Sequence, residues 1–251
     1  MLFSMLFDTE ETIPEGEGFE LFGLCHILWL LCAVLTCAVL CVVYHKAPDL
    51  IRGRILRIVA ALILADELLK HVMLAVSGDW ELDDLPFHLY GIQVFVCAAH
   101  ARRSTLAKAD FLYAFCLPAA LFALVFPSWS ALPPGNFIHV QSFTIHILLL
   151  LYPLLLLSGG YRPAFPRLKN VIAPVLLSCA LIFWINKLTG CNFLFLNRPG
   201  HGNPLALFAS YLGDPGYLAA IPLLFAAVWV LLYLPPYFAE RGKKKLAPAA
   251  R

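Results

Sequence analysis

Long apolar runs recur along the whole chain, separated by short polar connections. Within each run the hydrophobic residues are continuous rather than alternating, and several runs approach 20 residues, the length an α-helix needs to cross a bilayer. A helix satisfies its own backbone hydrogen bonds in lipid, and a β-barrel would require an alternating pattern. We expect seven helical spans, at residues 19–44, 54–76, 86–101, 109–127, 136–158, 168–189 and 216–238.

The composition agrees with a membrane protein. Of the 251 residues, 61% are hydrophobic and 14% are charged. A soluble domain carries about 25% charged residues, so the charge here is too sparse to cover a water-facing surface. The pattern predicts an all-α, polytopic membrane protein. It comprises a short exterior leader (1–18), a seven-transmembrane-helix bundle (19–238) and a basic cytoplasmic tail (239–251).

The basic residues fall on one side of these spans. Fifteen of the 18 Lys and Arg residues lie in the first, third and fifth connections and in the C-terminal tail. Lys and Arg concentrate on the cytoplasmic side of membrane proteins. With seven spans, this distribution places the N-terminus outside and the C-terminus in the cytoplasm. We therefore expect a multi-pass protein of the cell membrane.

No cofactor is implied by the sequence. Most of the eight cysteines lie inside apolar runs, and no CxxC pair or Cys/His cluster has zinc spacing, so we interpret them as small apolar helix residues. There is no metal motif, nucleotide-binding loop or dinucleotide fingerprint. The net charge is only +2, and the charged residues are distributed according to the side of the membrane. The charge therefore gives no reason to expect that the protein binds nucleic acid. Membrane lipids are the expected partners, and the oligomeric state is left open.

Ionisable side chains at membrane depth are the main functional signal. Each costs about 2.5–3.5 kcal/mol on insertion scales, so each needs a partner or a role. The second span carries Asp66, Glu67, Lys70 and His71 within an arc of about 140°. Both acids have the spacing of an intrahelical ion pair with Lys70. This group is either an ion-paired packing face between helices or one wall of a buried polar site.

The remaining polar side chains come from the third, fifth and sixth spans and from the connection after the sixth. They are His88, His139, Ser142, His146, Asn186, Asn192, Asn197 and Arg198. Counting along each span places most of them toward its outer end, and scattered structural residues would not share one depth. We therefore expect one polar cavity that opens toward the outer leaflet, while each histidine taken alone also fits a packing role.

The connection after the sixth span is rich in turn-forming residues, which predicts a loop. Arg198 is the only basic residue in an expected outer connection. Its planar guanidinium can hold a phosphate or carboxylate through two parallel hydrogen bonds. It can equally pair with Asp214 or with an acidic residue of the 77–85 connection.

The order and spacing of four segments, within residues 19 to 236, are similar to those of a known family. The segments are Glu67–Lys70, Leu85–Leu89, Gln141–His146 and Asn186–Arg198. They resemble the bacterial YwaF-like membrane proteins related to the eukaryotic transmembrane protein 164 family. The resemblance implies an intramembrane lipid acyltransferase, distantly similar to the androgen-induced-gene group of membrane lipid hydrolases. Those proteins use a nucleophile and a histidine within the membrane, and His146 matches that histidine.

The family's cysteine has no counterpart in this chain. Phe87 stands where eukaryotic members have it, and Tyr90 stands where many bacterial members have it. The hypothesis is acyl transfer between a phospholipid and a lysolipid, with His146 or His88 as the catalytic base. Ser142 is a fallback nucleophile. The expected substrate-binding residues are Glu67, Lys70, His139, Asn186, Asn192, Asn197 and Arg198.

Two other classes of function stay open. Buried Asp, Glu, Lys and His also mark ion pathways, so a transporter or channel for a small polar or lipidic solute is one alternative. Against it, the inner half of the bundle is poor in polar residues and no repeated half with broken helices is visible. A non-catalytic membrane scaffold is the other alternative, because the family's cysteine is missing.

Overall fold

The computed structural model describes residues 6–8, 12–14, 16–200 and 204–246, and these residues form helices and connections without any strand. Parts of the expected leader and tail therefore lie outside the described residues. The α-helices are α1 (Leu24–Lys46), α2 (Asp49–Ser77), α3 (Leu89–Arg102), α4 (Leu106–Phe111), α5 (Leu117–Val125), α6 (Phe137–Ser158), α7 (Lys169–Thr189), α8 (Pro204–Leu212) and α9 (Ala220–Leu246). Shorter turns are η1 (Leu82–Asp84), the π-helical η2 (Leu112–Cys116), η3 (Phe165–Arg167), η4 (Phe193–Phe195) and η5 (Gly216–Ala219).

Each of the seven expected spans contains a helix, but not all of these helices are long and apolar enough to cross a membrane. In the described part of the chain, five helical segments are long and apolar enough to cross one: Leu24–Lys46, Leu106–Val125, Phe137–Ser158, Phe165–Thr189 and Gly216–Pro236. The helix α2 is long enough, but it carries three charged residues near its middle. The helix α3 has only 14 residues, about 21 Å, against a hydrocarbon core of about 30 Å.

One helix was not expected. The turn-forming residues after the sixth span predicted a loop throughout, and the structure has α8 within that connection. Its first residue is Pro204, which a first helical turn tolerates because its missing N–H needs no partner there. The loop prediction was wrong for this stretch, because turn-forming residues before the helix obscured the short apolar run that follows them.

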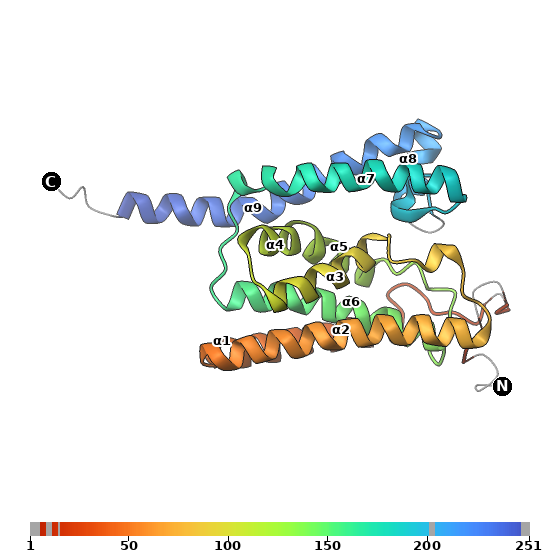
Figure 1. Cartoon of the computed structure of the whole chain (residues 1–251), viewed down its shortest axis with the longest axis horizontal. Helices are drawn as coiled ribbons and strands as arrows, with labels where there is room; N and C mark the ends of the chain where they lie inside the picture. Colours follow the sequence, from red (N-terminus) through yellow and green to blue (C-terminus); the bar gives the residue numbers. More distant parts are fainter. Residues whose placement is uncertain (1–5, 9–11, 15, 201–203, 247–251) are drawn as a thin grey trace.

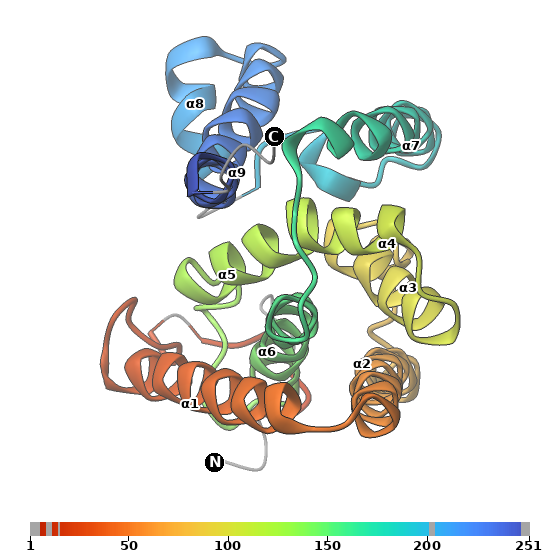
Figure 2. The ribbon, with the colours of Figure 1, turned by 90° about the vertical axis from the view of Figure 1, so that its left-hand side faces the viewer.

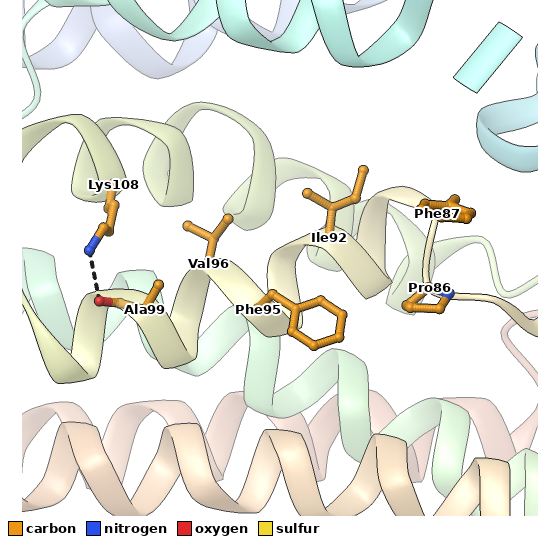
Figure 3. Close-up of a pocket in the computed structure, with 7 residues that line it drawn as sticks. All are labelled: Pro86, Phe87, Ile92, Phe95, Val96, Ala99 and Lys108. Carbon is orange, nitrogen blue, oxygen red and sulfur yellow. Dashed lines mark hydrogen bonds between the residues drawn. The ribbon is translucent and has the colours of Figure 1, made fainter. Parts of the chain in front are cut away.

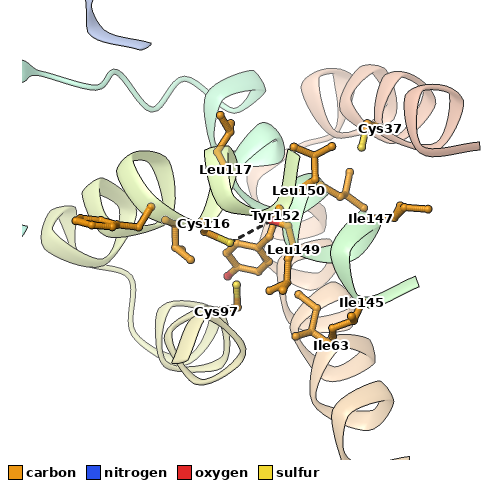
Figure 4. Packing of buried hydrophobic residues seen from close by; sticks show 14 of the residues in the cluster. Cys37, Ile63, Cys97, Cys116, Leu117, Ile145, Ile147, Leu149, Leu150 and Tyr152 are labelled. Atoms are coloured by element: carbon orange, nitrogen blue, oxygen red, sulfur yellow. Dashed lines mark hydrogen bonds between the residues drawn. The ribbon is translucent and has the colours of Figure 1, made fainter. Parts of the chain in front are cut away.

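The helix α6 is the centre of the bundle. It packs against α1, α2, α3 and α5, which surround it in the end-on view of Figure 2. Its residues Leu149, Leu151, Tyr152 and Leu155 are fully buried, as a helix that is apolar on all sides requires. Figure 4 shows Tyr152 among apolar side chains that include Leu149 and Leu150, beside the buried Cys97 and Cys116. All eight cysteines are free thiols.

A second layer, formed by α7, α8 and α9, lies along one side of this bundle (Figure 1). The π-helical turn η2 attaches α9 to it. In this wider turn the Leu117 N–H donates to the Leu112 carbonyl, five residues back. The Ala114 carbonyl within the turn accepts a hydrogen bond from the Trp229 indole at 2.9 Å. The Tyr113 hydroxyl in turn donates to the Leu232 carbonyl at 2.6 Å.

A buried carboxylate fixes the start of α7 to the end of α4. Asp110 is 2% exposed and accepts hydrogen bonds from Arg167 Nε at both of its oxygens, at 3.1 and 2.9 Å. The Tyr161 hydroxyl, in the connection between α6 and α7, donates to the same carboxylate. Burial, and next the Asp110 carboxylate, raise the pKa of Tyr161 above its ordinary value, so it stays a donor.

Gly91 allows the turn before α3 to pack against the first turn of the helix. A Cβ at this position would lie 2.7 Å from the Pro86 Cα, which is closer than side chains can approach backbone. We expect Gly91→Ala to lower the midpoint of thermal unfolding in detergent. Gly53 in α2 has nothing within 4 Å of an added Cβ. The matched Gly53→Ala change should stabilise the helix by about 0.5–1 kcal/mol. Equal midpoints for the two variants would contradict this account.

Candidate functional site

Lys70 is a charged side chain enclosed by the bundle. It is 5% exposed and Glu67, on the same helix, is 4% exposed. Lys70 Nζ lies 3.4 Å from Glu67 Oε1 and donates to the Tyr90 hydroxyl oxygen of α3 at 2.6 Å. A buried charge requires such partners. Because Lys70 supplies the hydrogen in this bond, the hydroxyl hydrogen of Tyr90 remains able to donate to another acceptor.

His146 is held in one orientation on α6. Its Nδ1 lies 2.7 Å from the Ser142 carbonyl oxygen, one turn earlier. A carbonyl only accepts, so Nδ1 carries the proton and the neutral ring keeps a lone pair on Nε2. The ring stacks on Trp129 at 5.0 Å, and its centroid lies 5.8 Å from that of Tyr90. His146 is therefore in the tautomer that accepts a proton at Nε2, beside the Tyr90 ring.

His88 completes this group from the end of α3. It is the residue preceding the helix, with an extended backbone. Its ring lies nearly parallel to Tyr90, with centroids 6.3 Å apart, and 5.2 Å from the Phe193 ring. Tyr90 thus contacts both histidines expected to be catalytic, together with Lys70. We call Glu67, Lys70, His88, Tyr90 and His146 the polar cluster.

The three asparagines expected to bind substrate instead hold the loop of residues 191–198. The Asn186 amide exchanges two hydrogen bonds with the backbone of Phe193, both at 2.9 Å. Asn192 Oδ1 accepts the N–H groups of Asn197 and Arg198 at 3.1 and 3.0 Å. The Asn197 amide donates to the Cys191 carbonyl at 3.0 Å. These side chains determine the shape of the loop and lie outside the polar cluster.

The 191–198 loop covers the His88 side of the cluster. Leu194 and Phe195 have φ angles of 57° and 55°, a left-handed conformation that costs non-glycine residues energy and needs surrounding support. The Tyr217 hydroxyl provides part of it by donating to the Phe195 carbonyl at 2.8 Å. Phe193 is fully buried, with its ring 5.3 Å from Phe87. The loop thereby closes this side with aromatic side chains.

His139 and Arg198 lie apart from the polar cluster. His139 is fully buried, its Nε2 accepts from the Trp29 indole at 3.0 Å, and its Nδ1 lies 3.2 Å from the Leu132 carbonyl. Both ring nitrogens are used, which is the arrangement of a packing histidine. The Arg198 side chain is exposed. Within the described residues it pairs neither with Asp214 nor with an acid of the 77–85 connection.

Two residues beside His146 did not stand out in the sequence, and Asp66 has another partner than its spacing suggested. Tyr90 was visible only as the residue that replaces a family cysteine, and nothing in the pattern placed Trp129 beside His146. Asp66 has the spacing to pair with Lys70, yet its Oδ2 accepts from Gln141 Nε2 of α6 at 2.7 Å. Of Asp66 and Glu67, only Glu67 forms an ion pair with Lys70 in the described part of the chain.

An apolar groove of about 430 Å³ follows α3 from the edge of the polar cluster. Figure 3 shows its lining, which is Pro86, Phe87, Ile92, Phe95, Val96, Ala99 and Lys108. Lys108 ends the groove by donating to the carbonyls of Ala99 and Arg103, at 2.8 and 2.7 Å. These carbonyls belong to the last turn of α3, where a cation is favourable. The other end of the groove is at Phe87, directly before His88 in the chain.

Three helices bring the polar cluster to one level. Lys70 lies 13 residues along α2 from Arg57, which at 1.5 Å per residue is about 20 Å. Tyr90 and His146 each lie 12 residues, about 18 Å, from the last residue of their helix, which is Arg102 in α3 and Ser158 in α6. Arg57 and Arg102 line one groove, so these distances are counted from the same side of the bundle. The cluster is therefore a layer across the bundle rather than a set of separate polar residues.

The Glu67–Lys70 pair gives a direct test of this geometry. Removing one partner leaves the other charge buried, so Lys70→Met or Glu67→Leu should each lower the free energy of unfolding by about 3–5 kcal/mol. The double variant leaves no uncompensated charge and should lose much less than the sum. The measurement is a double-mutant cycle of unfolding in detergent micelles. If the two single losses sum to the loss in the double variant within about 0.5 kcal/mol, the two side chains do not interact.

Comparison with known proteins identifies the family. A scan against protein-family models matches residues 21–233 to the TMEM164 family, which covers most of the chain and every residue of the polar cluster. Comparisons with curated proteins and with solved structures found no match. The family and the apolar helices together indicate a multi-pass membrane protein. The chain belongs to the TMEM164 family.

Proposed function

We propose that this protein is an intramembrane lipid acyltransferase that moves an acyl chain from a phospholipid to a lysolipid. The observation that carries the proposal is the contact of His146 with Tyr90. Among the described residues His146 Nε2 has no hydrogen-bond partner, and the Tyr90 hydroxyl oxygen is bound by Lys70. Acyl transfer needs a base for the attacking hydroxyl and a donor for the developing oxyanion. These two side chains supply both.

In the proposed reaction, His146 Nε2 takes the proton of the lysolipid hydroxyl while its oxygen attacks the acyl carbonyl carbon of the donor. The carbonyl oxygen becomes negative and accepts a hydrogen bond from the Tyr90 hydroxyl. Lys70 strengthens that donor, because a cation bonded to the hydroxyl oxygen polarises the O–H bond. The ester bond of the donor then breaks, and the imidazolium returns its proton to the departing lysolipid oxygen. One ester is consumed and one is formed.

This route accounts for the missing cysteine. Phe87 has no nucleophilic atom, and the Tyr90 hydroxyl is assigned to the oxyanion. Direct attack by the acceptor hydroxyl needs no acyl-enzyme, so neither position has to carry a thiol. The Ser142 carbonyl orients His146 in this scheme, and its hydroxyl is kept as the fallback nucleophile.

We further propose seven membrane crossings, with the N-terminus outside and the C-terminus in the cytoplasm. The distribution of Lys and Arg supports this orientation. The helix α2 packs along α3 and α6, and its buried Glu67 and Lys70 are paired, which lowers the cost of placing them in the membrane. The polar cluster, about 18–20 Å from the level of Arg57, Arg102 and Ser158, then lies in the outer half of a hydrocarbon core of about 30 Å.

The length of α3 supports access from lipid. Because α3 spans only about 21 Å, His88 at its start lies roughly 9 Å below the outer boundary of the core. The 191–198 loop covers it from that side. The apolar groove that starts at Phe87 gives lipid acyl chains a surface beside the cluster. A hydrophobic substrate can thus approach from the membrane while bulk water is kept out.

Two variants test the catalytic assignment. In purified protein reconstituted with labelled donor phospholipid and a panel of lysophospholipids, His146→Ala should lower the transfer rate by about 10²–10⁴. Tyr90→Phe should lower it by about 10²–10³, because it removes the oxyanion donor and little else. His45→Ala, which changes an exposed histidine at the inner end of α1, should keep the wild-type rate. Wild-type rates in both site variants, or no transfer by folded wild-type protein, would overturn the proposal.

The crossings are tested by labelling with a membrane-impermeant maleimide. Ser128 and Ser104 are both exposed and lie in successive connections. In intact cells Ser128→Cys should be labelled, and Ser104→Cys should react only after permeabilisation. The unsubstituted protein measures the background from native thiols. Labelling of both positions from the same side, or in the reverse order, would contradict the proposed topology.

A further inference from the structure

A second groove lies between α2 and α3 near their basic ends, away from the polar cluster. Its volume is about 470 Å³. Its apolar lining is Leu64 and four alanines, two from each helix, including Ala61 and Ala98. Arg57 of α2 and Arg102 of α3 complete it. Lys70 lies 13 residues further along α2 than Arg57, about 20 Å away, so the two sites are separate.

The alanines explain why two packed helices leave a groove. On α3, Ala98 and Ala101 are three residues apart and share one face, and on α2 Ala61 lies four residues from Arg57 and three from Leu64 along one face. A methyl side chain fills little of the space between neighbouring helices, so a channel remains along the contact. Figure 2 shows α2 and α3 at the edge of the bundle, where they pack against each other, and Ala61 and Leu64 at the groove are exposed.

Within the part of the chain that the structure describes, the charges at the groove have no acidic partner. Arg57 Nε donates to the Gly53 carbonyl at 3.1 Å, and among the described residues neither Arg57 nor Arg102 forms an ion pair with a carboxylate. By contrast, Arg52 pairs with Asp49 and Arg167 with Asp110. A guanidinium is well suited to a phosphate, which it can bind through two parallel hydrogen bonds.

We propose that this groove binds an anionic phospholipid of the cytoplasmic leaflet, with its phosphate at Arg57 and Arg102 and one acyl chain along the alanines. The apolar part alone would select no occupant, because lipid tails are as apolar as the groove. The two arginines provide the selection, since each basic residue near an anionic surface strengthens attraction about fivefold. The groove lies at the basic ends of both helices, which is the depth of the inner headgroups.

The test is which lipids the full-length protein retains. The protein is placed in nanodiscs of phosphatidylcholine with a minor fraction of phosphatidylglycerol, and the lipids that stay bound after its release are identified by native mass spectrometry. Wild-type protein should retain phosphatidylglycerol over phosphatidylcholine by at least about fivefold. Arg57→Gln/Arg102→Gln should abolish that preference. The control is Arg54→Gln/Arg103→Gln, which removes the same charge from exposed arginines that do not line the groove.

A third variant separates the groove from its charge. Ala98→Leu fills the groove and keeps both arginines, so it should lower retention of phosphatidylglycerol as well. Loss of preference in the control to the same extent would show attraction by the basic surface in general and would overturn the proposal. Unchanged retention in Ala98→Leu would do so too, as would equal retention of the two lipids by wild-type protein. Acyl-transfer rates are not needed for any of these outcomes.

Discussion

The rest of the site depends on one buried lysine. A cation at the depth of Lys70 costs about 2.5–3.5 kcal/mol to insert, and the protein offsets that cost with Glu67 from the same helix and Tyr90 from the next. The bond to Tyr90 fixes the first turn of α3 against α2. It also leaves the Tyr90 hydroxyl hydrogen able to donate to another acceptor, and the Tyr90 ring lies beside the His146 ring. The same contact that makes the lysine tolerable in the bundle thus positions a polarised donor beside a base.

In the proposed reaction, the short helix α3 determines where the chemistry takes place. A helix of about 21 Å cannot cross the core alone, so in the proposed topology the chain before it has to cover the remaining depth. That segment, with the 191–198 loop held by Asn186, Asn192 and Asn197, then closes the outer side. The lipid side stays accessible through the groove at Phe87. Shielding from water on one side and access for lipid on the other are what an acyl-transfer site requires, because water competes with the acceptor hydroxyl.

The helices and the Glu67–Lys70 pair could be predicted from the sequence, because both follow from local periodicity. The roles of the individual polar residues could not. His139 and His146 are seven residues apart on one face of α6. The Trp29 indole of α1 donates a hydrogen bond to His139, whereas the Tyr90 ring of α3 contacts His146. Their difference lies in tertiary partners that spacing does not encode. The hydrogen bonds of the asparagines to the loop backbone could not be predicted either, because the pattern does not show which backbone groups of a loop need partners.

The most direct measurement of the central claim is acyl transfer in proteoliposomes of uniform orientation, with the labelled donor phospholipid confined to one leaflet. The account places the Lys70–Tyr90–His146 group in the outer half of the membrane. Product should therefore form when the donor is in the leaflet on the N-terminal side, and the rate should fall to background when the donor is in the opposite leaflet. Product from the cytoplasmic leaflet alone would contradict the position of the site. No product from either leaflet, in folded protein, would contradict the acyl-transfer chemistry itself.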